Sequence, residues 1–206
     1  MENKASHKNR INLNPITRLF ENPKRSIEPY VREGQVAADL GCNTGYYTFA
    51  LADCVGTEGK VYAVDLKEEY IRALEKKGDR LGYNNIEWHT ANASNLNFIK
   101  DESVDFVLAN GLLCNVPDNR GLVVNEIQRI LKPTGQAFIS LGGVSPFFGF
   151  MGRAEWERIL ETFIVKQRGG FIQKWAAVSK KEKSKYIEGN NVKRPRFLKL
   201  RKKSGE

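Results

Sequence analysis

Histidine and cysteine are scarce in this chain of 206 residues, and their scarcity narrows the chemistry that it can do. His7 and His89 are the two histidines, so neither a histidine-based catalytic triad nor a metal centre is expected. Cys42, Cys54 and Cys114 are scattered, and no two of them form a CxxC pair. Odd in number and widely spaced, they predict reduced thiols in a cytoplasmic protein, with neither a disulfide framework nor a zinc site.

Long apolar runs are also absent. No stretch of about eighteen apolar residues occurs, so we predict no transmembrane segment. The N-terminal segment Met1–Arg10 is polar and lacks the apolar core of a signal peptide. The length of the chain suits one α/β domain that carries extensions.

Acidic residues are too few to balance the basic ones at the C-terminal end. Residues 180–206 carry +8 of the net charge of +9, from eleven Lys or Arg and three Glu. Such a charge run indicates a solvated tail or one that binds an acidic partner, such as a nucleic acid. At the other end, three prolines between residues 15 and 29 limit any helices to short pieces. We therefore predict an N-terminal extension (1–33), a central domain (34–179) and a basic tail (180–206).

Strand and helix patterns alternate through the central domain. Short β-rich runs predict strands, and apolar positions three or four residues apart predict the helices between them. The order predicts a Rossmann-like, doubly wound α/β fold with a mostly parallel sheet, helices on both faces and a C-terminal antiparallel hairpin. The predicted strands are residues 36–40, 61–64, 85–89, 104–108, 136–141, 163–166 and 171–178, and the predicted helices are residues 46–52, 68–81, 122–131 and 153–163.

The most informative segment is a glycine turn after the first predicted strand. Val36–Gly45 reads VAADLGCNTG, and Val61–Asp65 follows as a strand that ends in a carboxylate. This pattern is typical of half of a nucleotide-binding βαβ unit, whose acidic residue accepts hydrogen bonds from ribose hydroxyls. A dinucleotide fingerprint would need glycines where Asn43 and Tyr46 stand, and Asp39 would place a negative charge near a pyrophosphate. An adenosine-containing ligand with cationic groups suits the segment better.

The acidic residue followed by a glycine turn resembles motif I of the class I S-adenosylmethionine-dependent methyltransferases, which reads G-x-G-x-G. Asn43 replaces the middle glycine, and asparagine visits the left-handed region more readily than most residues. The resemblance covers about residues 35–179 and includes Asp105–Asn110 on the fourth strand and Leu131–Gly135 before the fifth. It implies a seven-stranded sheet, S-adenosylmethionine as the cofactor, and transfer of the sulfonium methyl group.

The resemblance also implies a set of cofactor-binding residues. Asp65 would accept hydrogen bonds from the ribose, and Asp39 would reach the amino end; alternatively, Asp65 caps the following helix and Asp39 binds backbone amides. Asn92 would face the adenine amine, and Asn110 would face the methionine part or the substrate, unless each asparagine only forms a turn. The full predicted set is Asp39, Gly41, Asn43, Gly45, Asp65, Leu66, Asn92, Ala93 and Asn110.

No catalytic side chain is predicted. A sulfonium methyl group is already activated, so its transfer needs an aligned acceptor more than a strong acid or base. The sequence from Asn110 to Leu113 lacks the Asn/Asp-Pro-Pro-aromatic motif of nucleic-acid amino-methyltransferases, so we expect a small-molecule acceptor. The aromatic-rich stretch from Phe147 to Trp156 would either line an apolar acceptor pocket or pack on the core.

Other functions stay open from the sequence. An RNA methyltransferase would use the basic tail to hold its substrate. A non-catalytic module would bind the cofactor without transferring its methyl group, because a fold does not fix a function. An NAD-dependent oxidoreductase would use a related nucleotide-binding fold. The sequence gives no prediction of the oligomeric state.

Overall fold

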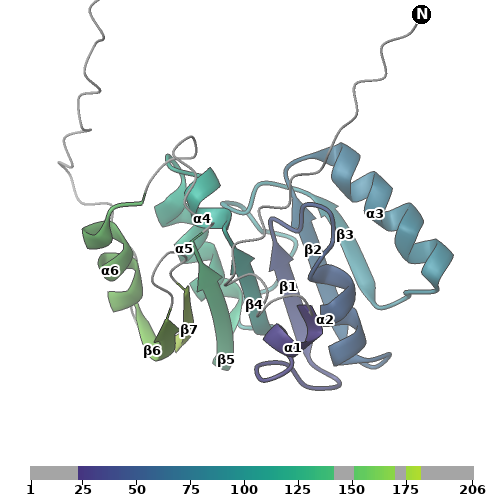
Figure 1. Ribbon diagram of the computed structural model, residues 1–206, viewed down its shortest axis with the longest axis horizontal. Helices are drawn as coiled ribbons and strands as arrows, with labels where there is room; N and C mark the ends of the chain where they lie inside the picture. The colour runs from purple at the N-terminus through teal and green to yellow at the C-terminus, as the bar shows by residue number, and fades with distance from the viewer. Residues whose placement is uncertain (1–22, 142–150, 170–174, 182–206) are drawn as a thin grey trace, which may run out of the picture.

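A seven-stranded sheet forms the centre of the computed structural model, which describes residues 23–141, 151–169 and 175–181 (Figure 1). The strands are β1 (Val36–Leu40), β2 (Lys60–Asp65), β3 (Ile86–Thr90), β4 (Val104–Asn110), β5 (Leu131–Ser140), β6 (Phe163–Gly169) and β7 (Trp175–Lys180). Strands β1–β5 are parallel, and β7 pairs antiparallel with both β5 and β6. The order β3-β2-β1-β4-β5-β7-β6 reverses between β1 and β4. Ligands of such sheets bind beyond the strand ends at the reversal.

Helices cover both faces of this sheet. They are α1 (Pro23–Ile27), α2 (Thr48–Val55), α3 (Glu68–Leu81), α4 (Leu112–Asn115), α5 (Arg120–Ile130) and α6 (Arg153–Glu161). Helices α1, α2 and α3 pack on one face of the sheet, and α4, α5 and α6 pack on the other (Figure 1). None of the helices in the described ranges has the length and apolarity that crossing a membrane requires.

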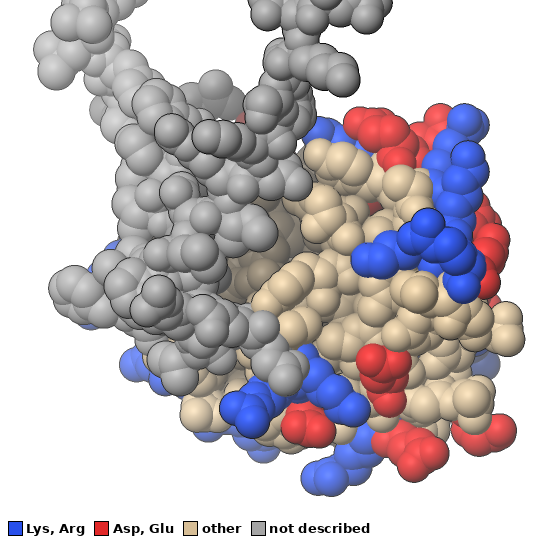
Figure 2. Space-filling model, turned by 45° about the vertical axis from the view of Figure 1, so that its right-hand side comes forward, with Lys and Arg blue, Asp and Glu red and all other residues tan. Residues whose placement is uncertain are grey.

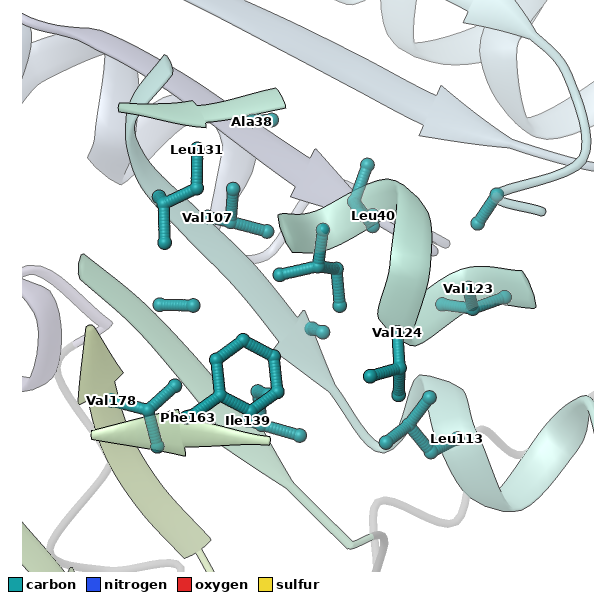
Figure 3. Close-up of a cluster of buried hydrophobic side chains, with 14 of the residues drawn as sticks. Ala38, Leu40, Val107, Leu113, Val123, Val124, Leu131, Ile139, Phe163 and Val178 are labelled. Carbon is teal, nitrogen blue, oxygen red and sulfur yellow. The ribbon is translucent and has the colours of Figure 1, made fainter. Parts of the chain in front are cut away.

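Two hydrophobic clusters, one on each face, hold the layers together. Neighbouring residues of β1 alternate between them: Ala37 contacts the cluster of α2 and α3, whereas Ala38 and Leu40 contact that of α5 and α6. Successive side chains of a strand point to opposite faces, so a strand covered on both sides is apolar along most of its length. In the second cluster, Leu113 of α4 and Val124 of α5 point toward the side chains of the sheet (Figure 3).

The structure confirms the predicted fold and corrects several boundaries. Helix α2 begins at Thr48, not Tyr46, because the glycine turn continues through Tyr47, whose carbonyl accepts the first helical hydrogen bond. Strand β5 begins at Leu131, so Pro133 lies inside the strand and not in a turn before it. The pairing of β5 with β4 is irregular between Val104 and Phe106, and such an interruption is where a strand tolerates proline. Helix α4 was not predicted.

Several predictions fall outside the described residues. These predictions concern the helices expected before residue 23, the basic tail beyond residue 181, and the aromatic residues Phe147, Phe148 and Phe150. Strand β6 continues to Gly169, three residues beyond its predicted end, and β7 is described from Trp175. The division into extension, domain and tail stays a prediction.

Candidate functional site

The glycine turn leaves β1 at the point where the strand order reverses. Gly41 and Gly45 have φ angles of 77° and 74°, and Asn43 has a φ of 49°. Asn43 therefore adopts the left-handed conformation that asparagine tolerates. The amides of Gly41 and Cys42 both donate to the carbonyl oxygen of Val64, at 2.8 and 3.0 Å. These bonds fix the turn to the end of β2.

The carboxylate of Asp65 ties the same two elements together from the other side. One oxygen, Oδ2, accepts a hydrogen bond from the amide of Asn43 at 2.9 Å. The other, Oδ1, accepts one from the amide of Lys67 at 2.9 Å, so Asp65 also orders the turn that leads into α3. A carboxylate oxygen has two lone pairs, so both oxygens keep the capacity to accept a ligand hydroxyl.

Asp39 is buried beneath the turn, with 3% of its surface exposed. Its Oδ2 atom accepts a hydrogen bond of 2.7 Å from Thr48 Oγ1, in the first turn of α2. Burial raises the pKa of Asp39 to about 7, Asp65 adds to the rise, and the Thr48 hydrogen bond opposes it. Burial also raises the pKa of the adjacent Cys42 thiol, which keeps this cysteine protonated and unreactive.

The segment after β3 carries Asn92, whose side chain forms a local turn. Its Oδ1 atom accepts hydrogen bonds from the amide and the hydroxyl of Ser94, at 3.0 and 2.9 Å. The turn considered as an alternative role for Asn92 is therefore present. Its predicted contact with an adenine amine stays a prediction.

At the end of β4, Asn110 contacts the neighbouring strand β5. Its Oδ1 atom accepts a hydrogen bond from the hydroxyl of Ser140. Gly111 follows with a φ of 71°, and its amide donates to the carbonyl oxygen of Ser140 at 3.0 Å. The sharp turn at Gly111 directs the chain into α4 and places Leu112 over Gly41, where an added Cβ atom would lie 3.2 Å from Leu112 Cδ1.

These elements enclose a pocket of about 220 Å³ at the ends of the strands. Five of the nine predicted residues line it: Gly41, Asp65, Leu66, Asn92 and Ala93. Asp39, Asn43, Gly45 and Asn110 do not line it. Gly45 instead lines a neighbouring pocket on the α2 side of the turn. The remaining wall residues are Val64, Ala91, Leu112, Asn115, Val116, Pro117, Asp118 and Asn119.

The wall from Leu112 to Asn119 is the part that sequence reasoning missed. The available signal was a turn-forming sequence, Pro117-Asp118-Asn119, that follows within ten residues of the end of β4 at the reversal point. The pocket combines apolar side chains with two carboxylates, Asp65 and Asp118, and with the amides of Asn92, Asn115 and Asn119. Apolar surface beside hydrogen-bonding groups is a suitable environment for a purine and a ribose. This donor set fits S-adenosylmethionine, as predicted from motif I.

Candidate catalytic groups lie away from this pocket. His89 stacks on Phe98, with ring centroids 3.9 Å apart, and does not line the pocket. Met151 and Trp156, which the sequence placed either in an acceptor pocket or on the core, are buried in the core cluster. Within the described residues, neither a histidine nor a cysteine lines the pocket.

Comparison with known proteins agrees with this geometry. Residues 37–135 match a family described as a methyltransferase domain. Demethylmenaquinone methyltransferase of Geobacillus stearothermophilus is 38% identical over 120 residues, which are 58% of this chain and 50% of that protein. The chain thus spans about half the length of the curated relatives that it matches.

Two solved structures share the fold. One is an S-adenosylmethionine-dependent methyltransferase from Aquifex aeolicus, with a TM-score of 0.67 and 22% identity, covering 80% of this chain and 93% of that chain. The other is the PH0226 protein of Pyrococcus horikoshii, with a TM-score of 0.68 and 19% identity, covering 84% and 94%. At these identities, the likeness shows the fold alone.

Proposed function

Because this chain belongs to the class I S-adenosylmethionine-dependent methyltransferase superfamily, we propose that it transfers the sulfonium methyl group of S-adenosylmethionine to a small-molecule acceptor. The observation that carries the proposal is the double attachment of Asp65. This carboxylate fixes the glycine turn and also lines the apolar pocket.

We assign the cofactor contacts to this chain's residues by chemistry. Asp65 would accept hydrogen bonds from the ribose hydroxyls with its remaining lone pairs. Leu66, Ala93 and Leu112 would cover the faces of the adenine ring. Gly41 allows the backbone to approach the ligand closely, because it carries no side chain on the pocket side. Asp39 would attract the ammonium group of the cofactor from beneath the turn.

The reaction would depend on positioning more than on an acid or a base. When bound, S-adenosylmethionine supplies an activated methyl group. The chain would hold the acceptor in line with that group, and alignment of two reactants can be worth about 7–11 kcal/mol. The apolar walls would exclude water from the reacting atoms.

An apolar, ring-containing acceptor is the class that we favour. The relatives named as demethylmenaquinone methyltransferases support it. The range that matches the methyltransferase-domain family, residues 37–135, contains the glycine turn, Asp65 and the pocket wall. The prediction that the basic tail binds RNA concerns residues outside the described ranges. On the described part of the face shown in Figure 2, basic and acidic side chains are interspersed.

Calorimetric titration with S-adenosylhomocysteine, the product form of the cofactor, tests the proposed site. Asp65→Ala should weaken binding at least about tenfold, or about 1.4 kcal/mol, because the ribose acceptor and the attachment of the turn are both lost. Asp53→Ala is the matched control: this exposed carboxylate also accepts a hydrogen bond, from Tyr83 at 2.8 Å, but lies outside the pocket.

If the wild type, Asp65→Ala and Asp53→Ala all bind S-adenosylhomocysteine with equal affinity, Asp65 does not belong to the site. Methyl transfer to demethylmenaquinone would then test the acceptor class, with bulk tRNA as the competing substrate. Transfer to tRNA alone would replace the small-molecule proposal with the RNA alternative.

A further inference from the structure

Arg120 closes the loop that forms one wall of the pocket. It is the first residue of α5, and only 6% of its surface is exposed. Its Nε atom donates a hydrogen bond of 2.7 Å to the carbonyl oxygen of Leu113, seven residues earlier. The pocket wall after α4, residues 115–119, lies between these two points. The hydrogen bond therefore restrains the ends of the wall segment.

The same guanidinium binds a second element. Its Nη1 atom donates to both carboxylate oxygens of Glu155, at 3.0 and 2.9 Å. Glu155 lies in the first turn of α6, a favourable position for an anion because of the helix dipole. The side chains of Arg120 and Glu155 are 7% and 25% exposed. One side chain thus connects the pocket wall to a helix that does not line the pocket.

Stability alone does not account for this arrangement. A cation at the N-terminal end of a helix opposes the helix dipole. A buried ion pair also loses hydration, so replacing it by apolar residues often leaves stability unchanged or higher. Apolar residues are close to Arg120 along the chain: Leu113, Val123 and Val124 belong to the hydrophobic cluster of this face (Figure 3). What a guanidinium adds is a fixed geometry, because its donors lie in one rigid plane.

We propose that Arg120 is a positioning residue, which sets the shape of the pocket wall Leu112–Asn119 by joining Leu113 to Glu155 of α6. The identity of the ligand rests on the function proposed above, whereas the link itself does not. A change in α6 at Glu155 should accordingly alter the pocket wall, although Glu155 does not line the pocket.

Two variants break the link, and a third serves as a matched control. Arg120→Lys keeps the charge but loses the planar fork, so a single ammonium cannot reproduce both contacts. Glu155→Gln removes the charge of the partner with little change in volume. The control, Gln128→Met, removes a different buried hydrogen bond, which Gln128 Nε2 donates to the carbonyl oxygen of Thr162 at 2.8 Å. Gln128 lies about 12 Å from Arg120 along α5.

Hydrogen–deuterium exchange of the unliganded protein is the first measurement. Amides of residues 112–119 should exchange about five- to tenfold faster in Arg120→Lys and in Glu155→Gln, because the wall opens locally more often. In Gln128→Met these amides should exchange at the wild-type rate, even if the melting temperature falls equally. Unchanged exchange in Arg120→Lys, or equal acceleration in all three variants, would overturn the proposal.

The affinity for S-adenosylhomocysteine is the second measurement. We expect about fivefold weaker binding for Arg120→Lys and Glu155→Gln, and a change within about twofold for Gln128→Met. If the wild type does not bind this ligand, the proposed function fails while the exchange data still decide the role of Arg120. If binding is intact in the two link variants, the pocket wall does not need Arg120 and the proposal fails.

Discussion

The wall of the pocket at β1 and β2 is held by backbone amides that donate to neighbouring residues of one βαβ unit, whereas the wall after β4 is held mainly by side chains from distant elements. In the first, amides of the glycine turn bind Val64 and Asp65 within one βαβ unit. In the second, Ser140 of β5 and Arg120 of α5 hold the chain around α4. A backbone-held wall depends on which residues permit its φ angles. A side-chain-held wall depends on contacts that the whole fold must first assemble.

Changing a glycine of the turn that supports the first wall should have the largest effect. Gly45→Ala forces a non-glycine residue to a φ of 74°, and its Cβ atom would lie 2.5 Å from Leu74 Cδ2. Left-handed strain of about 1–2 kcal/mol and overpacking of about 1–3 kcal/mol should together lower the free energy of unfolding by about 2–5 kcal/mol. Urea unfolding measures the loss.

Gly82→Ala is the matched control for Gly45→Ala. Gly82 has a φ of 79°, but nothing lies within 4 Å of an added Cβ atom. Only the strain contribution should appear, about 1–2 kcal/mol. Equal losses in the two variants would show that close contact with Leu74 does not constrain the turn.

The buried carboxylate beneath the first wall should give the next largest effect, and it depends on pH. Asp39 ionises near pH 3.9 in the unfolded chain, whereas burial raises its pKa to about 7 in the folded protein. Between these values the folded state binds more protons, so this group's contribution to stability falls as pH rises from about 4 to 7. Above pH 7 the loss is complete, on the order of 2–4 kcal/mol.

Asp39→Asn should remove this dependence. The variant should be more stable than the wild type at pH 8, and the difference should shrink toward pH 4. Chemical unfolding at several pH values measures it, with Asp53→Asn as a control on an exposed carboxylate of α2. A stability difference between Asp39→Asn and the wild type that is the same at every pH would contradict the raised pKa.

Ser140→Ala tests the second wall and should have the smallest effect. Ser140 is 1% exposed, donates to Asn110 Oδ1 and accepts a hydrogen bond from the amide of Gly111 at 3.2 Å. Losing both bonds should lower the free energy of unfolding by about 1–2 kcal/mol. Ser94→Ala, which removes one hydroxyl bond to Asn92, should cost less. An equal loss of free energy of unfolding in Ser140→Ala and Ser94→Ala would contradict the prediction that the two Ser140 hydrogen bonds stabilise the second wall.

The contrast between the two walls also explains what could be predicted from the sequence. The glycine turn and the left-handed conformation of Asn43 depend on residues close in the chain, so the sequence pattern predicted them. The topology followed in the same way, because strands that alternate with helices favour one parallel order. The hydrogen bond from the amide of Asn43 to Asp65, which joins the turn to β2, was not predicted. Asn43 illustrates the limit of a motif, since it departs from the family pattern in residue type and yet adopts the left-handed backbone conformation that glycine favours.

The second wall could not be predicted, because its contacts join residues far apart in the sequence. Arg120 and Glu155 are 35 residues apart, and neither stands in a recognisable motif. Helix α4 is only four residues long, which is too short to produce a periodic pattern. Strand β5 began earlier than expected for a similar reason: pairing between Leu131 and Val104 overrides the turn preference of Pro133.

The direct junction between α5 and β5 has a mechanical consequence. Helix α5 ends at Ile130 and the strand begins at Leu131 without a connecting loop. The carbonyl oxygens of Arg129 and Ile130 also accept hydrogen bonds from Glu102 and Ser103, both at 2.9 Å, so this end is anchored. Helix α5 is about 16 Å long and can therefore act as a lever with its pivot at this junction. A tilt of about 5° would move the opposite end, at the pocket, by roughly 1.4 Å.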